Sequence, residues 1–277
     1  MKKGMNMYGV PGRFTLREAF SMLRCAGYDG VELNMEAGPR DDGTPSLHAG
    51  SSDGELNEIR ATAEKNKLEI TSLVTPLLWK YPLTANDIAV REKGKALVAR
   101  LLDAAAVLGA GTVLVVPGAV NAETHYEDAY NNALTAIREL SAHAEKRRVH
   151  IGVENVWNKM LLSPLEMRGF IDAAGSDWVG AYFDIGNVLV SGYPDQWIQI
   201  LGDRIRRLHA KGFKNAVGNI TGFTTLLAGD IDWTAVMAAV RGIGYDGYIT
   251  AELDPYDAFP ANMLKETSTA LDSIFAL

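Results

Sequence analysis

Short β-branched runs alternate with longer amphipathic stretches along the whole chain. A strand that is covered on both faces appears as a continuous apolar run, whereas a helix packed on a sheet repeats its apolar residues every three or four positions. On this basis we expect eight strands, at about residues 5–10, 31–33, 68–74, 112–116, 149–153, 179–183, 205–208 and 248–251. Helices are expected between them and after the last one, at about residues 15–26, 53–67, 86–108, 126–147, from 163 onward, 195–201, 232–243 and 261–275.

Residues that start and end helices support this division. Thr15 is followed three positions later by Glu18, which is the pattern of a capping box, and Gly27 is suited to end the same helix. Ser163 followed by Pro164 marks another helix start. Because strands that alternate with helices form parallel sheets, eight such units favour the α/β class and a closed (β/α)8 TIM barrel over an open sheet.

The length and composition suit one such barrel. The chain has 277 residues, 47% of them hydrophobic, and a barrel of this kind typically needs about 250 residues. No linker or compositional break divides the sequence, so we expect a single domain over residues 1–277. A stretch rich in Gly, Pro and Ser from Gly38 to Gly54 is expected to form a long loop on the catalytic face, where it could act as a lid.

Charge and cysteine content limit the partners and the compartment. A formal net charge of −7 argues against nucleic acid, whose recognition needs clustered Lys and Arg. No apolar run approaches the ~20 residues that span a bilayer, and no secretory leader is evident. The only cysteine, Cys25, cannot form an intrachain disulfide. We therefore expect a cytoplasmic protein with no nucleic-acid or membrane partner; a homo-oligomer is compatible with the sequence.

Candidate chemistry gathers at the ends of the last four strands. Active sites of such barrels lie where strands end and the following loops begin. The fifth to eighth strands deliver Glu154, Asp184, His209 and Glu252 to that edge. Because three crowded carboxylates repel one another unless a cation holds them, we expect one divalent metal ion there. Oxygen-rich ligation favours Mn or Mg, with Co and Zn also compatible.

Each of these residues also has an ordinary structural explanation. A carboxylate at a strand end often caps a helix or pairs with a lysine. Asp184 could turn the chain before Asn187, and His209 could belong to a solvated basic stretch with Lys211. The occurrence of four such residues on consecutive strands favours the metal site.

Five short motifs resemble the sugar phosphate isomerase/epimerase family, the xylose isomerase-like barrels that include the ketose 3-epimerases. They occur in the same order over nearly the whole chain: Val153-Glu154-Asn155, Tyr182 to Asn187, Leu208 to Lys211, Gly229 to Trp233 and Thr250 to Leu253. The resemblance implies that Glu154, Asp184, His209 and Glu252 are metal ligands. It also implies that Glu154 and Glu252 exchange the substrate proton, as a catalytic pair acting through an enediolate.

The resemblance implies a substrate class and marks two departures. The substrate would be a ketose or ketose phosphate, contacted by Asn187, Lys211 and Lys159. Many relatives carry His at the position of Asn187, although members that resemble the phosphorylated-ketose epimerases carry Asn, and the residue at the position of Gly212 is often Asp. Both departures affect how the substrate would be held.

Three other functions remain open from the sequence. A lyase or an aldose–ketose isomerase could use the same metal site, because an enediolate partitions in several ways. A sugar-binding relative without turnover is compatible with the fold. An abasic-site endonuclease would need three zinc ions and several histidines, whereas the strand ends offer only His209.

Overall fold

Eight parallel strands close into a barrel in the computed structural model, which describes residues 1–277. Around the barrel the order is β1-β10-β7-β6-β5-β4-β3-β2. The strands are β1 (Lys2–Asn6), β2 (Gly30–Asn34), β3 (Glu69–Val74), β4 (Thr112–Val115), β5 (His150–Glu154), β6 (Val179–Asp184), β7 (Ile205–Ala210) and β10 (Tyr248–Ala251). The predicted (β/α)8 barrel is therefore confirmed.

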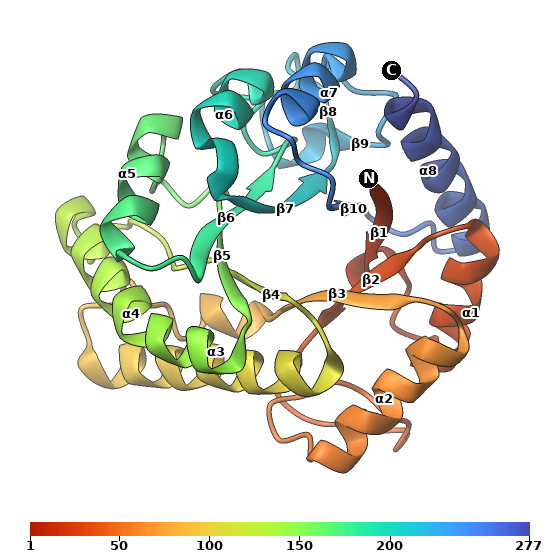
Figure 1. The fold of residues 1–277 in the computed structure, drawn as a ribbon, viewed down its shortest axis with the longest axis horizontal. Helices are drawn as coiled ribbons and strands as arrows, with labels where there is room; N and C mark the ends of the chain where they lie inside the picture. Colours follow the sequence, from red (N-terminus) through yellow and green to blue (C-terminus); the bar gives the residue numbers. More distant parts are fainter.

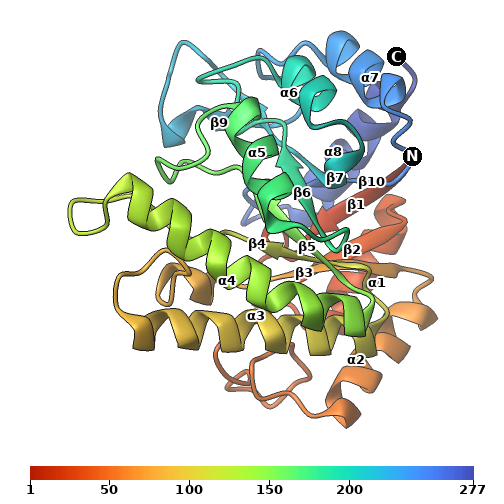
Figure 2. The ribbon, with the colours of Figure 1, turned by 60° about the vertical axis from the view of Figure 1, so that its left-hand side comes forward.

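Eight helices surround the strands (Figure 1). They are α1 (Leu16–Ala26), α2 (Asp53–Lys65), α3 (Ile88–Leu108), α4 (Tyr126–Arg147), α5 (Pro164–Ala174), α6 (Pro194–Leu201), α7 (Trp233–Gly242) and α8 (Pro260–Phe275). The two longest, α3 and α4, lie side by side across one flank (Figure 2). None of the helices is long and apolar enough to cross a membrane.

The predicted helix ends follow from local hydrogen bonds. Thr15 caps α1 through its hydroxyl, which accepts from the backbone N–H of Glu18, while the Glu18 carboxylate accepts from the backbone N–H of Thr15 at 2.8 Å. Gly27 ends this helix at φ 91°, a left-handed conformation that favours glycine. Ser163 caps α5 and Pro164 is its first residue. The N-terminal caps fix where α1 and α5 start. They therefore also set the length of the loops between the preceding strand ends and these helices.

The barrel interior explains why the strands are apolar throughout. Every residue of β4 and β6 is buried, because one face lies inside the barrel and the other lies under the helices. Most buried apolar residues form one cluster, which contains members of every strand of the barrel. Leu114, Val116 and Tyr182 form a small second cluster. Burial on this scale holds the strand ends in fixed places.

Two elements differ from the pattern-based expectation. The first strand was expected at residues 5–10, but β1 ends at Asn6. Residues Met7–Gly9 form a 3-10 turn instead, in which the Asn6 side chain accepts from the backbone N–H of Tyr8. A short antiparallel pair, β8 (Gly212–Phe213) and β9 (Phe223–Thr224), was not expected. Two-residue strands are too short to show an apolar period.

The long loop between β2 and α2 is hydrogen-bonded to the segment between β1 and α1 and to helix α3. Arg40 donates to the backbone oxygen of Gly12 at 2.8 Å, and Arg100 of α3 donates to the backbone oxygens of Ala49 and Ser51. Within the loop, the side chain of Leu47 is buried. The role of this loop as a lid remains a prediction.

Candidate metal centre

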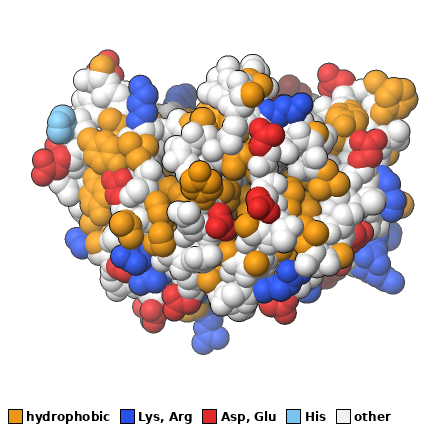
Figure 3. All heavy atoms as spheres, turned by 90° about the horizontal axis from the view of Figure 1, so that it is seen from above, with side chains coloured by type: hydrophobic (Ala, Val, Ile, Leu, Met, Phe, Trp, Pro, Cys, Tyr) orange, Lys and Arg blue, Asp and Glu red, His pale blue; other side chains and the backbone are white.

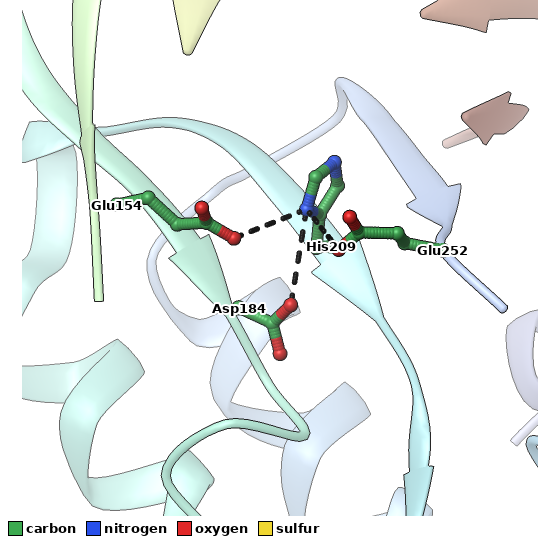
Figure 4. Close-up of side chains that lie close together, drawn as sticks. All are labelled: Glu154, Asp184, His209 and Glu252. Atoms are coloured by element: carbon green, nitrogen blue, oxygen red, sulfur yellow. Dashed lines mark ion pairs between the residues drawn. The ribbon is translucent and has the colours of Figure 1, made fainter. Parts of the chain in front are cut away.

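Four polar side chains from four neighbouring strands meet inside the barrel at its carboxyl-terminal end. Glu154 ends β5, Asp184 ends β6, His209 lies near the end of β7 and Glu252 follows β10. Each offers one ligand atom, and these atoms lie within 4.8 Å of one another (Figure 4). The structure thus brings together all four residues that the strand-end rule selected.

The imidazole of His209 is at the centre of the group. Its Nδ1 atom lies 3.2 Å from Glu252 Oε2, 3.4 Å from Glu154 Oε1 and 3.8 Å from Asp184 Oδ2. Glu154 and Glu252 approach this nitrogen from opposite sides (Figure 4). The separations leave the four ligand atoms facing a common point.

Three of these atoms are buried and form no hydrogen bond: Asp184 Oδ2, His209 Nδ1 and Glu252 Oε2. The two oxygens are contacted only through ion pairs with Lys211 and His209, and His209 Nδ1 has no partner other than the carboxylates around it. An unpaired polar atom in the interior costs free energy, and charged groups cost more than neutral ones. A divalent cation would satisfy all three atoms together with Glu154, so the residues present fit a metal ion. Three oxygen donors and one nitrogen donor suit a hard or intermediate cation.

The two glutamates have opposite acidities in the metal-free cluster. Burial, reinforced by the charge of Glu252, raises the pKa of Glu154 to about 7. Burial also opposes ionisation of Glu252, but the charges of Lys211 and His209 outweigh it and lower the pKa of Glu252 below its usual range. Identical side chains at one site therefore differ in acidity because their charged neighbours differ.

Lys211 belongs to the cluster. Its Nζ atom lies 2.6 Å from Glu252 Oε2 and 3.1 Å from Asp184 Oδ2. Burial lowers the pKa of Lys211, but attraction to these two carboxylates dominates and raises it above its usual value. The ammonium group therefore compensates part of the negative charge.

Hydrogen bonds with Asn155 and Asn187 hold the backbone and one carboxylate oxygen of Asp184 in place. Asn155 accepts from the backbone N–H of Asp184 and donates to its backbone oxygen, both at 2.8 Å. The backbone N–H of Asn187 donates to Asp184 Oδ1 at 2.8 Å, and the side-chain amide of Asn187 donates to the backbone oxygen of Asn155 at 2.9 Å. Asp184 Oδ1 thus stabilises the turn before Asn187, while Oδ2 faces the cluster. The same side chain can therefore both turn the chain and act as a metal ligand.

Lys159 lies apart from the other predicted site residues. It is exposed on the loop after β5, in a left-handed conformation at φ 60°, and it forms no ion pair with the four ligand residues. Its proposed contact with a substrate remains a prediction.

Glu32 is an important residue that the strand-end rule did not select. Its carboxylate is completely buried inside the barrel and accepts from His209 Nε2 at 2.7 Å. Burial raises the pKa of Glu32, but the charge of His209 and several hydrogen bonds outweigh it and lower the pKa below its usual value. The available signal was a carboxylate between Val31 and Leu33, in the middle of an apolar strand.

The structure explains why glycine stands at position 212. A Cβ atom added there would lie 2.1 Å from the backbone oxygen of Thr225, because Gly212 in β8 pairs with Thr224 of β9 and lies directly against the next residue. No side chain fits at position 212, so the aspartate that the family resemblance leads one to expect has no room there.

Aromatic rings form one wall beside the cluster. Trp157 lies 5.5 Å from Phe213 and 5.2 Å from Phe223, measured between ring centroids. The indole N–H of Trp157 donates to the backbone oxygen of Asn187 at 2.7 Å, which fixes the ring. A pocket of about 570 Å³ adjoins Phe223, Lys211 and Glu252. The size is sufficient for a small organic substrate.

Comparison with known proteins agrees with the observed fold. The family model of the xylose isomerase-like TIM barrel matches residues 20–274. A curated protein of Escherichia coli (strain K12), named provisionally as an L-ribulose-5-phosphate 3-epimerase, is 21% identical over 240 residues, which cover 85% of this chain and 82% of that protein.

Solved structures share the fold over the full length. A D-tagatose 3-epimerase-like protein is 18% identical with a TM-score of 0.83, over 100% of this chain and 97% of the other. An L-ribulose 3-epimerase is 16% identical with a TM-score of 0.80, over 99% and 94% of the two chains. At these identities the likeness concerns the fold.

Proposed function

Because the chain belongs to the family of xylose isomerase-like TIM barrels, we propose that it is a metal-dependent epimerase or isomerase of a ketose or ketose phosphate. The observation that carries this proposal is the set of four buried ligand atoms within 4.8 Å of one another. The named relatives that act as 3-epimerases of ketoses support the same reaction class.

We propose Glu154, Asp184, His209 and Glu252 as the ligands of one divalent ion. The three oxygen donors favour Mn or Mg, with Co and Zn also compatible. When bound, such an ion supplies Lewis-acid polarisation of the substrate carbonyl. The protein supplies the dry, fixed site in which this polarisation is strong.

Proton transfer is assigned to the two glutamates. A 3-epimerisation removes the proton from the carbon beside the carbonyl on one face and returns a proton on the other face. Glu154 and Glu252 lie on opposite sides of His209 Nδ1, which supports placing them on opposite faces of a substrate bound at this point (Figure 4). We therefore propose that one of these glutamates removes the proton on one face and the other returns a proton on the opposite face.

Substrate contacts are proposed for Lys211, Asn187 and Lys159. Lys211 is nearest to the ligand residues and can donate to a sugar hydroxyl or carbonyl oxygen. The side-chain N–H of Asn187 donates to the backbone oxygen of Asn155, so its side-chain oxygen is the atom that can accept a hydrogen bond from a substrate hydroxyl. Lys159 would have to reach the pocket from the exposed loop.

The charge around the pocket favours an unphosphorylated ketose. Lys211 is the only cationic side chain lining the pocket, and its ammonium group already pairs with two carboxylates. Asp254 and Glu252 add negative charge to the same wall. A phosphate would therefore meet little compensating charge. Equal kcat/KM values for a ketose and its phosphate, or a higher value for the phosphate, would contradict this preference.

A deuterium-exchange screen tests the proposed function. Protein loaded with Mn or Mg is incubated in D₂O with a panel of ketoses and their phosphates, and the products are identified by NMR after metal removal. We expect deuterium at the carbon beside the carbonyl and an epimeric product. An aldose product would indicate an aldose–ketose isomerase, a cleaved product would indicate a lyase, and binding without exchange would indicate a sugar-binding protein.

We also propose a cytoplasmic location and small-molecule partners. Cys25 is free and exposed, which suits a reducing compartment. On the face shown in Figure 3, acidic, basic and apolar side chains are intermixed. Such a surface, together with the net charge of −7, suits a sugar substrate rather than nucleic acid.

A further inference from the structure

A further buried carboxylate, outside the four candidate ligands, contacts the other nitrogen of the His209 ring. Glu32 is on β2, across the barrel from β7, and no part of its side chain is exposed. Four hydrogen bonds hold it: Asn6 Nδ2 and His209 Nε2 donate to Oε1, and Ser72 Oγ and Tyr182 OH donate to Oε2. Both oxygens of the carboxylate are therefore fully used.

The hydrogen bond to Glu32 decides which nitrogen of His209 faces the ligand cluster. An imidazole that binds a metal ion is neutral, with one N–H group and one nitrogen whose lone pair faces the metal. Glu32 accepts a hydrogen bond at 2.7 Å, which requires the N–H group to be on Nε2. The lone pair then lies on Nδ1, the atom that faces Glu154, Asp184 and Glu252.

Glu32 cannot turn away from this position. The donors Asn6, Ser72 and Tyr182 come from β1, β3 and β6, so they hold the carboxylate from three separate strands. All three side chains are at most 2% exposed. The ring of Tyr182 also packs on the imidazole of His209, with the centroids 4.5 Å apart. Orientation of the imidazole is thus determined by the barrel interior.

We propose that Glu32 is a positioning residue that orients His209 and selects its Nε2–H tautomer, with Asn6, Ser72 and Tyr182 as its supports. This inference rests on the proposed metal site. Glu32 does not touch the pocket, so its effect is on metal affinity. Partners of this kind typically change metal affinity 10–100-fold.

Metal titration of the metal-free protein tests the role of Glu32. Glu32→Gln keeps the size of the side chain but replaces one acceptor oxygen by a donor group. We expect its Kd for Mn, measured by calorimetry, to rise about 10–100-fold over that of the unaltered protein. Glu69→Gln, an exposed carboxylate on the neighbouring strand, is the matched control and should bind Mn normally. A Glu32→Gln variant that folds and binds Mn within threefold of the unaltered protein overturns the proposal.

A spectroscopic measurement separates orientation from general destabilisation. In metal-free protein, at a pH above the pKa of His209 so that the ring is neutral and no metal ion sets the tautomer, ¹⁵N NMR of the histidine rings should show the proton of His209 on Nε2. Glu32→Gln should lose this signature, and an unchanged tautomer would contradict the proposal. If Glu32→Gln does not fold, Ser72→Ala serves instead, because it removes one support without touching His209; Mn affinity and tautomer both unchanged in that variant would also overturn the proposal.

The two proposals fail in different ways. Unaltered protein that binds no divalent metal contradicts the proposed function itself. Unaltered protein that binds Mn tightly, with an equally tight Glu32→Gln variant, contradicts only the role of Glu32.

Discussion

At the scale of single residues, the surroundings of a side chain decide its chemistry more than its type does. Glu154 and Glu252 occupy equivalent strand ends, but only Glu252 has the ammonium group of Lys211 at 2.6 Å. Their positions were predictable from the rule that strand ends carry the site. Glu32 was not predictable in the same way, because its partners Asn6 and Tyr182 are far away in the sequence and meet it only inside the closed barrel.

Replacing Glu252 tests its assigned part in proton transfer. Glu252→Gln keeps the shape of the side chain but removes its basicity, so solvent deuterium should enter the substrate about 10²–10⁴-fold more slowly. Circular dichroism should show an unchanged fold. Glu64→Gln, on the outer helix α2, is the control and should exchange at the normal rate. Full exchange by Glu252→Gln would exclude the proposed role.

At the scale of elements, helix boundaries were predictable and the β8–β9 hairpin was not. Capping residues act on backbone groups three positions away, so the Thr15 and Ser163 signals can be recognised in the sequence. The hairpin is held by pairing of Gly212 with Thr224 and by its packing near Trp157. Such contacts depend on the fold of the surrounding chain.

Position 212 provides a test of the hairpin. In Gly212→Ala the new Cβ atom meets the backbone oxygen of Thr225, which cannot move without opening the β8–β9 pair. We expect a loss of about 1–3 kcal/mol in the free energy of unfolding, measured by urea denaturation. Gly169→Ala is the control, because nothing lies within 4 Å of its added Cβ in α5, and it should raise stability by about 0.5–1 kcal/mol. Equal stability of the two variants would contradict this explanation.

At the scale of the whole molecule, the barrel holds an acidic cluster that a cation should stabilise. The raised pKa of Glu154, about 7, means that its burial favours the neutral form. The associated stability is fully present below the unfolded pKa of about 4.3 and is lost as pH rises through about 7. A metal ion bound to ionised Glu154 would offset this loss. The difference in the free energy of unfolding between metal-loaded and metal-free protein should therefore be largest at alkaline pH.

Calorimetric melting with and without Mn tests this linkage. At a free Mn concentration of about 100 times Kd, the metal adds about 2.7 kcal/mol, which corresponds to a rise in Tm of about 5–10 °C for a chain of this size. With the free Mn concentration set at pH 8 and kept the same at pH 5.5, the rise should be larger at pH 8, because protons compete with the metal at low pH and weaken its binding. Asp184→Asn removes one candidate ligand charge and should show a smaller rise. A Tm rise that is the same at both pH values would contradict the assigned pKa of Glu154.

The sequence by itself determined the barrel, most of its helix ends and the four strand-end residues. Each of these depends on local information: the apolar period of a strand, the cap of a helix, or the residue that follows a strand. The tertiary structure alone decided that Glu32 orients His209, that Lys211 pairs with Glu252, and that position 212 has no room for a side chain. These features arise between strands that are distant in the chain, and barrel closure is what brings them within hydrogen-bond or van der Waals distance.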